Sequence, residues 1–250
     1  LNAHARRRFS AALADHFGSD HEILGKAIEK WTATPNDRAA ADLHYASEPR
    51  RLELFRRLNR APGGTAALVA MRADLLVEMR ADKALSPIDK DFTHLFASWF
   101  NRGFLVLRRI DWSTPASVLE RIIRYEAVHE IHDWNDLRRR IDPPDRRCYA
   151  FFHPALADEP LIFVEVALLE QIPGAVAPLL AHDRTAVAPE RARTAVFYSI
   201  SNCQKGLAGV TFGNFLIKQV VEELRRELPR LEHFVTLSPV PGFRAWLASA

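Results

Sequence analysis

The feature that most constrains the fold of this chain is a change in hydrophobic periodicity near residue 101. Before it, apolar residues recur at three- and four-residue spacing, and after it short continuous apolar runs dominate. The first pattern predicts helices, and the second predicts strands covered on both faces. The sequence therefore predicts an α+β protein, with an all-α bundle over residues 1–98 and a sheet flanked by helices over residues 99–250.

Within these halves, Pro, Gly and Asn punctuate the chain and set the expected element ends. The first half shows no strand pattern and predicts helices over 5–17, 20–31, 47–59, 64–80 and 89–100. The second half predicts strands over 104–107, 149–152, 161–169, 195–200 and 233–237, because these runs are rich in aromatic and β-branched residues. It also predicts helices over 114–131 and 214–228 and a last helix after Gly242.

Composition excludes several classes of protein. The net charge of +3 comes from short basic clusters with acids close by, which does not indicate nucleic-acid binding. The longest apolar run, 161–169, is far shorter than a bilayer span and contains Glu165, so no membrane segment is expected. Two cysteines, Cys148 and Cys203, provide no disulfide framework and fit a reducing compartment such as the cytoplasm. The N-terminus carries no secretory signal and reads as the interior of a longer chain.

A glycine-rich loop between a predicted strand and a predicted helix is the first candidate site. Gly206, Gly209 and Gly213 lie between the strand ending near 200 and the helix beginning at Asn214. Backbone amides at such a helix start can bind phosphate, although neither a Walker loop nor a dinucleotide fingerprint is present. A glycine-rich connection without a ligand is an equally good interpretation of the spacing.

The second candidate is Ser238, which follows a predicted strand and precedes Pro239. Ligand sites of α/β proteins open at strand ends, and the proline restricts Ser238 to extended geometry. From the residues alone, a serine that stabilises a turn is the favoured interpretation, since no base is adjacent.

Other polar residues are interpreted as structural. His129 and His132 are expected three residues apart on one helix and paired with acids, because they do not form a zinc motif. His153 is expected to satisfy backbone at a strand end, and Glu165 to meet an arginine or lie at the sheet rim. Cys203 is interpreted as packing, and no metal site is predicted.

Long runs of the chain resemble malonyl-CoA decarboxylases. They cover most of the sequence and comprise Pro49 to Asn59, Ser98 to Leu105, Tyr125 to Ile131, Asp145 to Pro154, Glu159 to Leu168, Phe197 to Ser201 and Thr236 to Phe243. The resemblance implies a helical oligomerisation domain followed by an acyl-CoA-binding catalytic domain of the GNAT type with a mixed sheet. It also implies a homo-oligomer and, by way of malonyl-CoA, a place in fatty acid metabolism.

The resemblance also assigns roles to residues. It implies that the CoA diphosphate rests on the loop formed by Ala208, Gly209, Val210, Thr211, Phe212, Gly213 and Asn214, and that Ser238 is catalytic. Against the general GNAT pattern this loop is degenerate, because Ala208 and Thr211 replace the usual Gln or Arg and first Gly. The second catalytic residue of the family is a histidine in a later motif, and none of the ten histidines matches it. We therefore expect a C-terminally incomplete chain that is inactive by itself.

The expected reaction is the decarboxylation of malonyl-CoA to acetyl-CoA and carbon dioxide. The thioester is the electron sink, so no cofactor is expected, and the CoA thioester is the substrate. An acyl-CoA-dependent acyltransferase and a non-catalytic CoA-binding scaffold are the alternative functions. Ser238 is expected to donate a hydrogen bond to the malonyl carboxylate or carbonyl.

Overall fold

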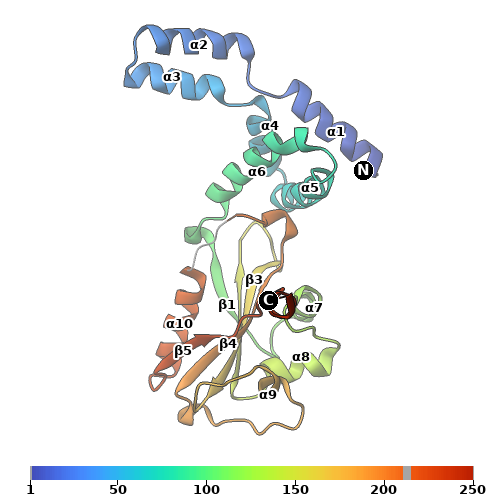
Figure 1. Ribbon diagram of the computed structural model, residues 1–250, viewed down its shortest axis with the longest axis vertical. Coiled ribbons are helices and arrows are strands. Elements are labelled where there is room, and N and C mark those ends of the chain that lie inside the picture. The colour runs from blue at the N-terminus through green and yellow to red at the C-terminus, as the bar shows by residue number, and fades with distance from the viewer. Residues whose placement is uncertain (1, 211–214, 250) are drawn as a thin grey trace. The chain divides into compact units, whose positions relative to one another are not determined.

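The computed structural model describes residues 2–210 and 215–249. The chain forms two compact units (Figure 1), one of residues 1–101 with 205–211 and the other of residues 102–204 with 212–250. We call them the helical unit and the sheet unit. A short segment far along the sequence, 205–211, thus belongs to the helical unit.

The first three helices of the helical unit begin where side chains satisfy the free amides of the first turn. The Asp20 carboxylate accepts from the amides of Glu22 and Ile23, and the Asn36 side chain accepts from the amide of Ala39. Helices α2 and α3 lie side by side as an antiparallel pair (Figure 1). The elements are α1 (Ala3–His16), α2 (His21–Ala33), α3 (Asp37–Ser47), α4 (Arg50–Asn59), α5 (Gly64–Glu78), η1 (Lys83–Leu85), α6 (Ser86–Trp99) and η4 (Lys205–Leu207).

Aromatic packing between α4 and α6 forms the core of the helical unit. Phe55 and Phe92 are stacked with ring centroids 4.3 Å apart, and Phe96 packs against Phe92 at 5.4 Å. Arg51 and Asp91 form a salt bridge between the same two helices, in which Arg51 is buried and Asp91 partly buried. The described part of this unit contains helices and no strands, as the periodicity predicts.

The sheet unit is built on five strands in the order β1-β2-β3-β4-β5. The neighbours from β1 to β4 are antiparallel, whereas β4 and β5 are parallel, so the sheet is mixed. This confirms the predicted α+β class with a mixed sheet. The strands are β1 (Val106–Ile110), β2 (Arg146–Phe152), β3 (Pro160–Leu169), β4 (Thr194–Asn202) and β5 (His233–Thr236). The helical elements are η2 (Arg102–Phe104), α7 (Ala116–Tyr125), α8 (Trp134–Ile141), α9 (Ala177–Leu180), η3 (Pro189–Arg191), α10 (Phe215–Glu227) and α11 (Phe243–Ser249).

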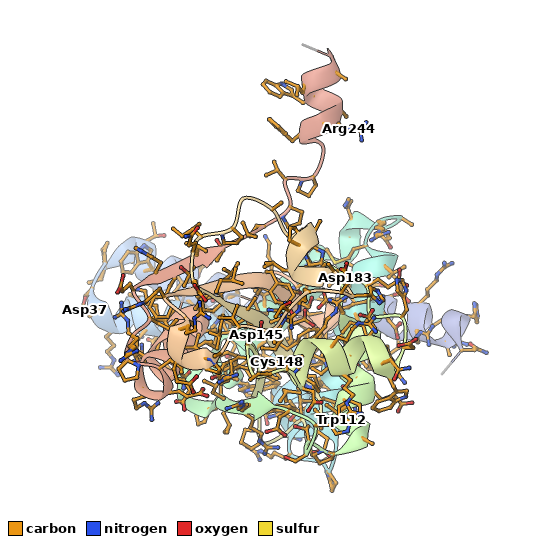
Figure 2. All side chains as sticks on the ribbon, turned by 90° about the horizontal axis from the view of Figure 1, so that it is seen from below. Asp37, Trp112, Asp145, Cys148, Asp183 and Arg244 are labelled. Carbon is orange, nitrogen blue, oxygen red and sulfur yellow. The ribbon has the colours of Figure 1, made fainter. Side chains whose placement is uncertain are left out.

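Helices cover both faces of the central strands. Along β2, Cys148 and Ala150 pack against the buried side chains of α7 and α8. Arg147 alternates with them and binds Glu227 of α10 on the other face, with Arg147 Nη2 2.6 Å from Glu227 Oε1. All residues of β2 and nearly all of β3 are buried, which confirms that these apolar runs are covered on both sides. By contrast α11, with Arg244, stands clear of the sheet (Figure 2) and contains no buried residue.

Several elements differ from the prediction, and the helices α8 and α9 were not predicted at all. Helix α3 was not predicted, and it buries only Ala39. Strand β1 lies two to three residues later than expected, because Arg108 and Arg109 pair with Ala150 and Tyr149 of β2. The helix predicted over 114–131 was wrong beyond Tyr125, where α7 ends and an irregular segment begins.

Candidate active site

A cavity of about 340 Å³ lies in the sheet unit where β5 ends. Strand β5 runs parallel to β4, and the Leu237 amide continues this pairing by donating to the Phe197 carbonyl at 2.9 Å. The next residue is Ser238, which is exposed. The residues that line the cavity are His129, Val176, Thr236, Leu237, Ser238 and Pro239.

The structure therefore places His129 in the same cavity as Ser238, a pairing that the sequence does not predict. The half-buried His129 ring lies beside Tyr198 of β4, with Nε2 3.1 Å from the Tyr198 carbonyl oxygen. A carbonyl oxygen can only accept, so Nε2 carries the hydrogen and Nδ1 is the acceptor in the neutral ring. Within the described chain, Nδ1 has no hydrogen-bond partner.

A β-bulge explains why the Tyr198 carbonyl can accept from His129. The register of β3 and β4 shifts between Glu165 and Val166, whose partners are Ser199 and Phe197. Tyr198 is thus the additional residue on β4, and it stands outside the regular ladder with β3. Bulges leave one residue unpaired and often occur beside functional sites.

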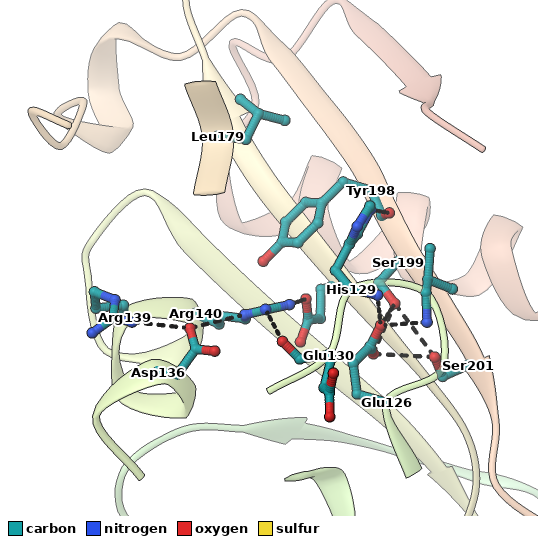
Figure 3. A network of polar contacts seen from close by, with 12 residues as sticks. Glu126, His129, Glu130, Asp136, Arg139, Arg140, Leu179, Tyr198, Ser199 and Ser201 are labelled. Carbon is teal, nitrogen blue, oxygen red and sulfur yellow. Dashed lines mark hydrogen bonds and ion pairs between the residues drawn. The ribbon is translucent and has the colours of Figure 1, made fainter. Parts of the chain in front are cut away.

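A buried carboxylate holds the segment that carries His129. Glu126 Oε1 accepts from the amides of Val128 and His129 at 2.9 and 2.7 Å. The same carboxylate accepts from Ser199 Oγ at 2.7 and 2.8 Å and from Ser201 Oγ at 3.1 Å (Figure 3). Ser199 and Ser201 alternate along β4, so both point to this carboxylate. We call Glu126, Ser199 and Ser201 the Glu126 clamp.

The Glu126 clamp also explains the early end of α7. The Glu126 carboxylate accepts from the amides of Val128 and His129, two and three residues later. These bonds compete with the helical hydrogen bonds that the same amides would otherwise make. The predicted helical placement of His129 and His132 was therefore wrong. His132 lies instead on the exposed surface, with Nδ1 3.9 Å from a Glu130 carboxylate oxygen. The expected pairing with acids thus holds for His132 alone, because the His129 ring contacts the Tyr198 carbonyl instead.

A second buried acid, Glu165, lies near the clamp. As predicted it meets an arginine, because Arg140 Nη1 is 3.2 Å from Glu165 Oε2. Complete burial and then the negative charge of Glu126 raise the pKa of Glu165 to about 7, although Arg140 opposes them. Arg140 also donates to the Glu130 carbonyl at 2.9 Å, which ties α8 to the segment that carries His129 (Figure 3).

The glycine-rich loop of the helical unit is held by Arg72 of α5. Arg72 Nη1 donates to the carbonyls of Gly206 and Ala208, both at 2.8 Å, while its Nε is 2.8 Å from Asp89. A Cβ atom at Gly206 would lie 1.8 Å from the Val69 carbonyl oxygen, and Gly209 has a φ of +76°. Packing and backbone conformation thus account for these two glycines without a ligand.

Three of the predicted CoA-binding residues lie in this loop. The amides of Ala208 and Val210 donate to carbonyls within the loop, at 3.2 and 3.0 Å. Ala208 and Gly209 are exposed. Of these three amides, only that of Gly209 has no hydrogen bond in the described chain. Thr211, Phe212, Gly213 and Asn214 lie outside the described residues.

The remaining candidates have structural roles. His153 Nδ1 accepts from the Ala155 amide at 3.1 Å, as expected for a residue at a strand end. Cys203 packs in the core, where burial raises the pKa of its thiol far above the usual value. Among residues 2–210 and 215–249, no cluster of His, Cys, Asp and Glu could hold a metal ion, and no helix is long and apolar enough to cross a membrane.

Fold and site together define a protein with a helical unit, a mixed-sheet unit and a ligand cavity at a strand end. Two family models match the chain: the malonyl-CoA decarboxylase N-terminal domain over residues 17–100 and the malonyl-CoA decarboxylase C-terminal domain over residues 103–250. The chain belongs to the malonyl-CoA decarboxylase family.

Similar proteins agree with this assignment. The chain is 39% identical to a mitochondrial malonyl-CoA decarboxylase of Anser anser anser and 38% identical to one of Mus musculus, covering 99% and 98% of this chain and 52% of each relative. A malonyl-CoA decarboxylase structure from Rhodopseudomonas palustris is 61% identical with a TM-score of 0.92, covering 100% of this chain and 61% of that one. One from Agrobacterium vitis is 58% identical with a TM-score of 0.95, covering 99% and 60%. The chain thus spans about half the length of these curated relatives.

Proposed function

We propose that this chain belongs to an enzyme that converts malonyl-CoA to acetyl-CoA and carbon dioxide. The observation that carries the proposal is that relatives named malonyl-CoA decarboxylases match essentially the whole chain, including the segment that brings Ser238 to the cavity. The cavity contains hydroxyl and imidazole groups beside apolar side chains, which suits a small polar acyl group.

The reaction sets clear demands on such a cavity. When carbon dioxide leaves, the electron pair of the broken carbon–carbon bond enters the thioester as an enolate, and the enolate carbon then takes up a proton. The thioester itself is the electron sink, so the proposed reaction needs no metal or redox cofactor. Hydrogen-bond donors placed where the negative charge develops lower the barrier. The exposed Ser238 hydroxyl is our candidate for such a donor.

Replacing Ser238 tests this role. In the protein extended to the full length of its relatives, Ser238→Ala should lower kcat by roughly a hundred- to thousandfold, because removal of one such donor costs about 3–4 kcal/mol. Malonyl-CoA consumption and carbon dioxide release measure the effect. Ser117→Ala, at an exposed serine of α7, is the matched control and should retain the wild-type rate. Near-normal turnover of Ser238→Ala would remove this hydroxyl from the mechanism.

The same assay distinguishes the other functions. Acetyl transfer to an added amine without carbon dioxide release would replace decarboxylation by acyltransfer on this fold. Binding of CoA without turnover by the extended protein would indicate a scaffold. The chain of 250 residues, assayed beside the extended protein, should be inactive, because the proton donor that the family resemblance implies lies in a later motif.

We further propose that CoA binds through the 208–214 loop and that the helical unit assembles into a homo-oligomer. The Gly209 amide, which has no hydrogen bond to the residues that the structure describes, supports the first proposal. Exposed apolar side chains on α2 and α3 support the second: Ile23, Ile28, Trp31 and Tyr45. Sedimentation velocity should show an oligomer that Ile23→Glu weakens, whereas a monomer would exclude assembly through this surface. Cys148 and Cys203 are buried free thiols, which fits the proposed reducing compartment, the cytoplasm. The proposed role in fatty acid metabolism rests on malonyl-CoA as the substrate.

A further inference from the structure

His129 shares the Ser238 cavity but takes no part in the mechanism above. We propose that His129 binds the free carboxylate of the acyl group and thereby makes the cavity select a malonyl thioester over an acetyl thioester. This inference rests on the proposed function, because it names the group that recognises the substrate of that reaction. His129 would be a specificity-determining residue in direct contact with the substrate.

The position of the ring is fixed before any ligand binds. Its Nε2–H donates to the Tyr198 carbonyl, which the β-bulge leaves outside the ladder with β3. The backbone amide of His129 is held by Glu126, which is itself bound by hydroxyls of β4. These contacts use one ring nitrogen and the main chain, so Nδ1 is the nitrogen that remains for a ligand. A preorganised side chain loses little freedom when it binds, which favours affinity.

The chemistry of the cavity lining identifies the ligand group. Val176, Leu237 and Pro239 are apolar, and Thr236 and Ser238 offer hydroxyls. His129 is the one lining residue among those described that can carry a positive charge. A carboxylate in a partly apolar cavity is costly unless it is hydrogen-bonded or ion-paired. A protonated His129 supplies the hydrogen bond and the opposite charge together, through Nδ1–H. Hydrogen bonds between charged groups are about twice as strong as neutral ones.

The malonyl group provides the carboxylate that this site would bind. The acetyl group of the product has no carboxylate. After carbon dioxide leaves, the ligand of His129 is gone, and the product should bind more weakly than the substrate. Selectivity between the two thioesters thus reports on His129 directly. Changes in CoA binding affect both thioesters equally, so they do not imitate this effect.

Binding measurements in the full-length protein test the proposal. Ser238→Ala serves as the background, because slow turnover allows the Kd of malonyl-CoA to be measured by calorimetry beside that of acetyl-CoA. Added to it, His129→Gln keeps an amide near the Nε2 position that can donate to the Tyr198 carbonyl, but has no group at the Nδ1 position. We expect the Kd of malonyl-CoA to rise about ten- to hundredfold, the range for a hydrogen bond to a charged group, and that of acetyl-CoA to change less than twofold.

Two further variants make the test specific. His129→Asn places its amide near the Nδ1 position and should recover part of the selectivity, which a purely structural role of the ring does not explain. His132→Gln, on the same segment but exposed, is the matched control and should leave both affinities unchanged. Urea unfolding midpoints of all variants establish that they fold.

Equal loss of affinity for both thioesters, or no loss for either, would overturn the inference. A selective loss of affinity for malonyl-CoA supports the inference. If the protein with Ser238 intact nevertheless releases no carbon dioxide, the proposed function fails while the inference stands. If that protein releases carbon dioxide but His129→Gln loses no selectivity, the inference fails while the proposed function stands.

Discussion

Two loops that carry candidate site residues are each held by one buried charged side chain, but with opposite chemistry. In the helical unit, the Arg72 guanidinium donates to the carbonyls of loop 205–210. In the sheet unit, the Glu126 carboxylate accepts from the amides of segment 126–132. The side chain that holds each loop therefore determines which groups remain for a ligand.

The consequences differ between the two loops. Arg72 occupies carbonyls, and the Gly209 amide, which has no hydrogen bond among the described residues, remains available, which suits an anionic ligand. Glu126 occupies amides, so the side chains of segment 126–132 are the groups that remain for a ligand. One of them, His129, lines the cavity. Arg72 thus favours recognition of phosphate by backbone amides, whereas the Glu126 clamp favours recognition by a side chain. The following variants test this contrast, from the largest expected effect to the smallest.

Arg72→Met should have the largest effect on stability. It removes the donor to two carbonyls and leaves Asp89 without its partner, and breaking a buried pair by removing one member costs about 3–5 kcal/mol. Urea unfolding followed by far-ultraviolet circular dichroism measures the free energy of unfolding of the helical unit. Arg57→Met, whose side chain is 73% exposed, is the matched control and should cost less than about 1 kcal/mol. A cost for Arg72→Met no greater than that of the control would show that the loop does not depend on Arg72.

Glu165, the buried acid near the Glu126 clamp, should make the stability of the sheet unit depend on pH. The pKa of Glu165 is raised from 4.5 to about 7, so between these values the folded state holds a proton that the unfolded state has lost. Stability must therefore fall as pH rises through this window, by on the order of 3 kcal/mol, and stay level above it. Wild type compared with Glu165→Gln at pH 5 and pH 7.5 isolates this contribution.

Glu126→Gln sharpens the pH prediction. The charge of Glu126 contributes to the raised pKa of Glu165, so this variant should lower that pKa and move the fall in stability to lower pH. Glu120→Gln, at an exposed residue of α7, is the control and should leave the fall where it is. If the stability of wild type and of Glu165→Gln changed with pH in parallel, the fall in stability would not come from the raised pKa of Glu165.

The smallest effects concern two glycines of the loop held by Arg72. Gly206→Ala brings a Cβ into the Val69 carbonyl and should cost about 1–3 kcal/mol, as overpacking does. Gly209→Ala meets no atom within 4 Å and should cost only about 1 kcal/mol, for its left-handed φ. Thermal unfolding of both variants compares them. The reverse order would indicate that backbone conformation, rather than contact with α5, fixes this loop.

The elements with strong patterns were predicted well. The apolar stripe of α10 and its end before Pro229 were clear in the sequence, and α10 covers nearly the predicted range. Periodicity failed where a local polar interaction replaced it. The spacing between 114 and 131 is helical throughout, but the Glu126 carboxylate takes the amides of Val128 and His129, so the helix ends at Tyr125.

The candidate site was predicted only in part. Ser238 could be proposed because a strand, a serine and a proline are consecutive and resemble the family motif. His129 could not be proposed, since it lies 109 residues before Ser238 and its spacing to His132 indicates only a helix surface. The glycines of the 205–210 loop were ambiguous, because contact with α5 and phosphate binding both require glycine.

By itself, the sequence determined most of the helices and strands, the α+β class and the family of this protein. These properties follow from local patterns and from long runs of matching residues. Only the tertiary structure decided that Glu126 meets two serines 73 and 75 residues away, that Arg72 holds a loop more than 130 residues later, and that His129 joins Ser238. The physical reason is that such contacts depend on where the sheet and the helices bring distant residues together, which periodicity along the chain does not record.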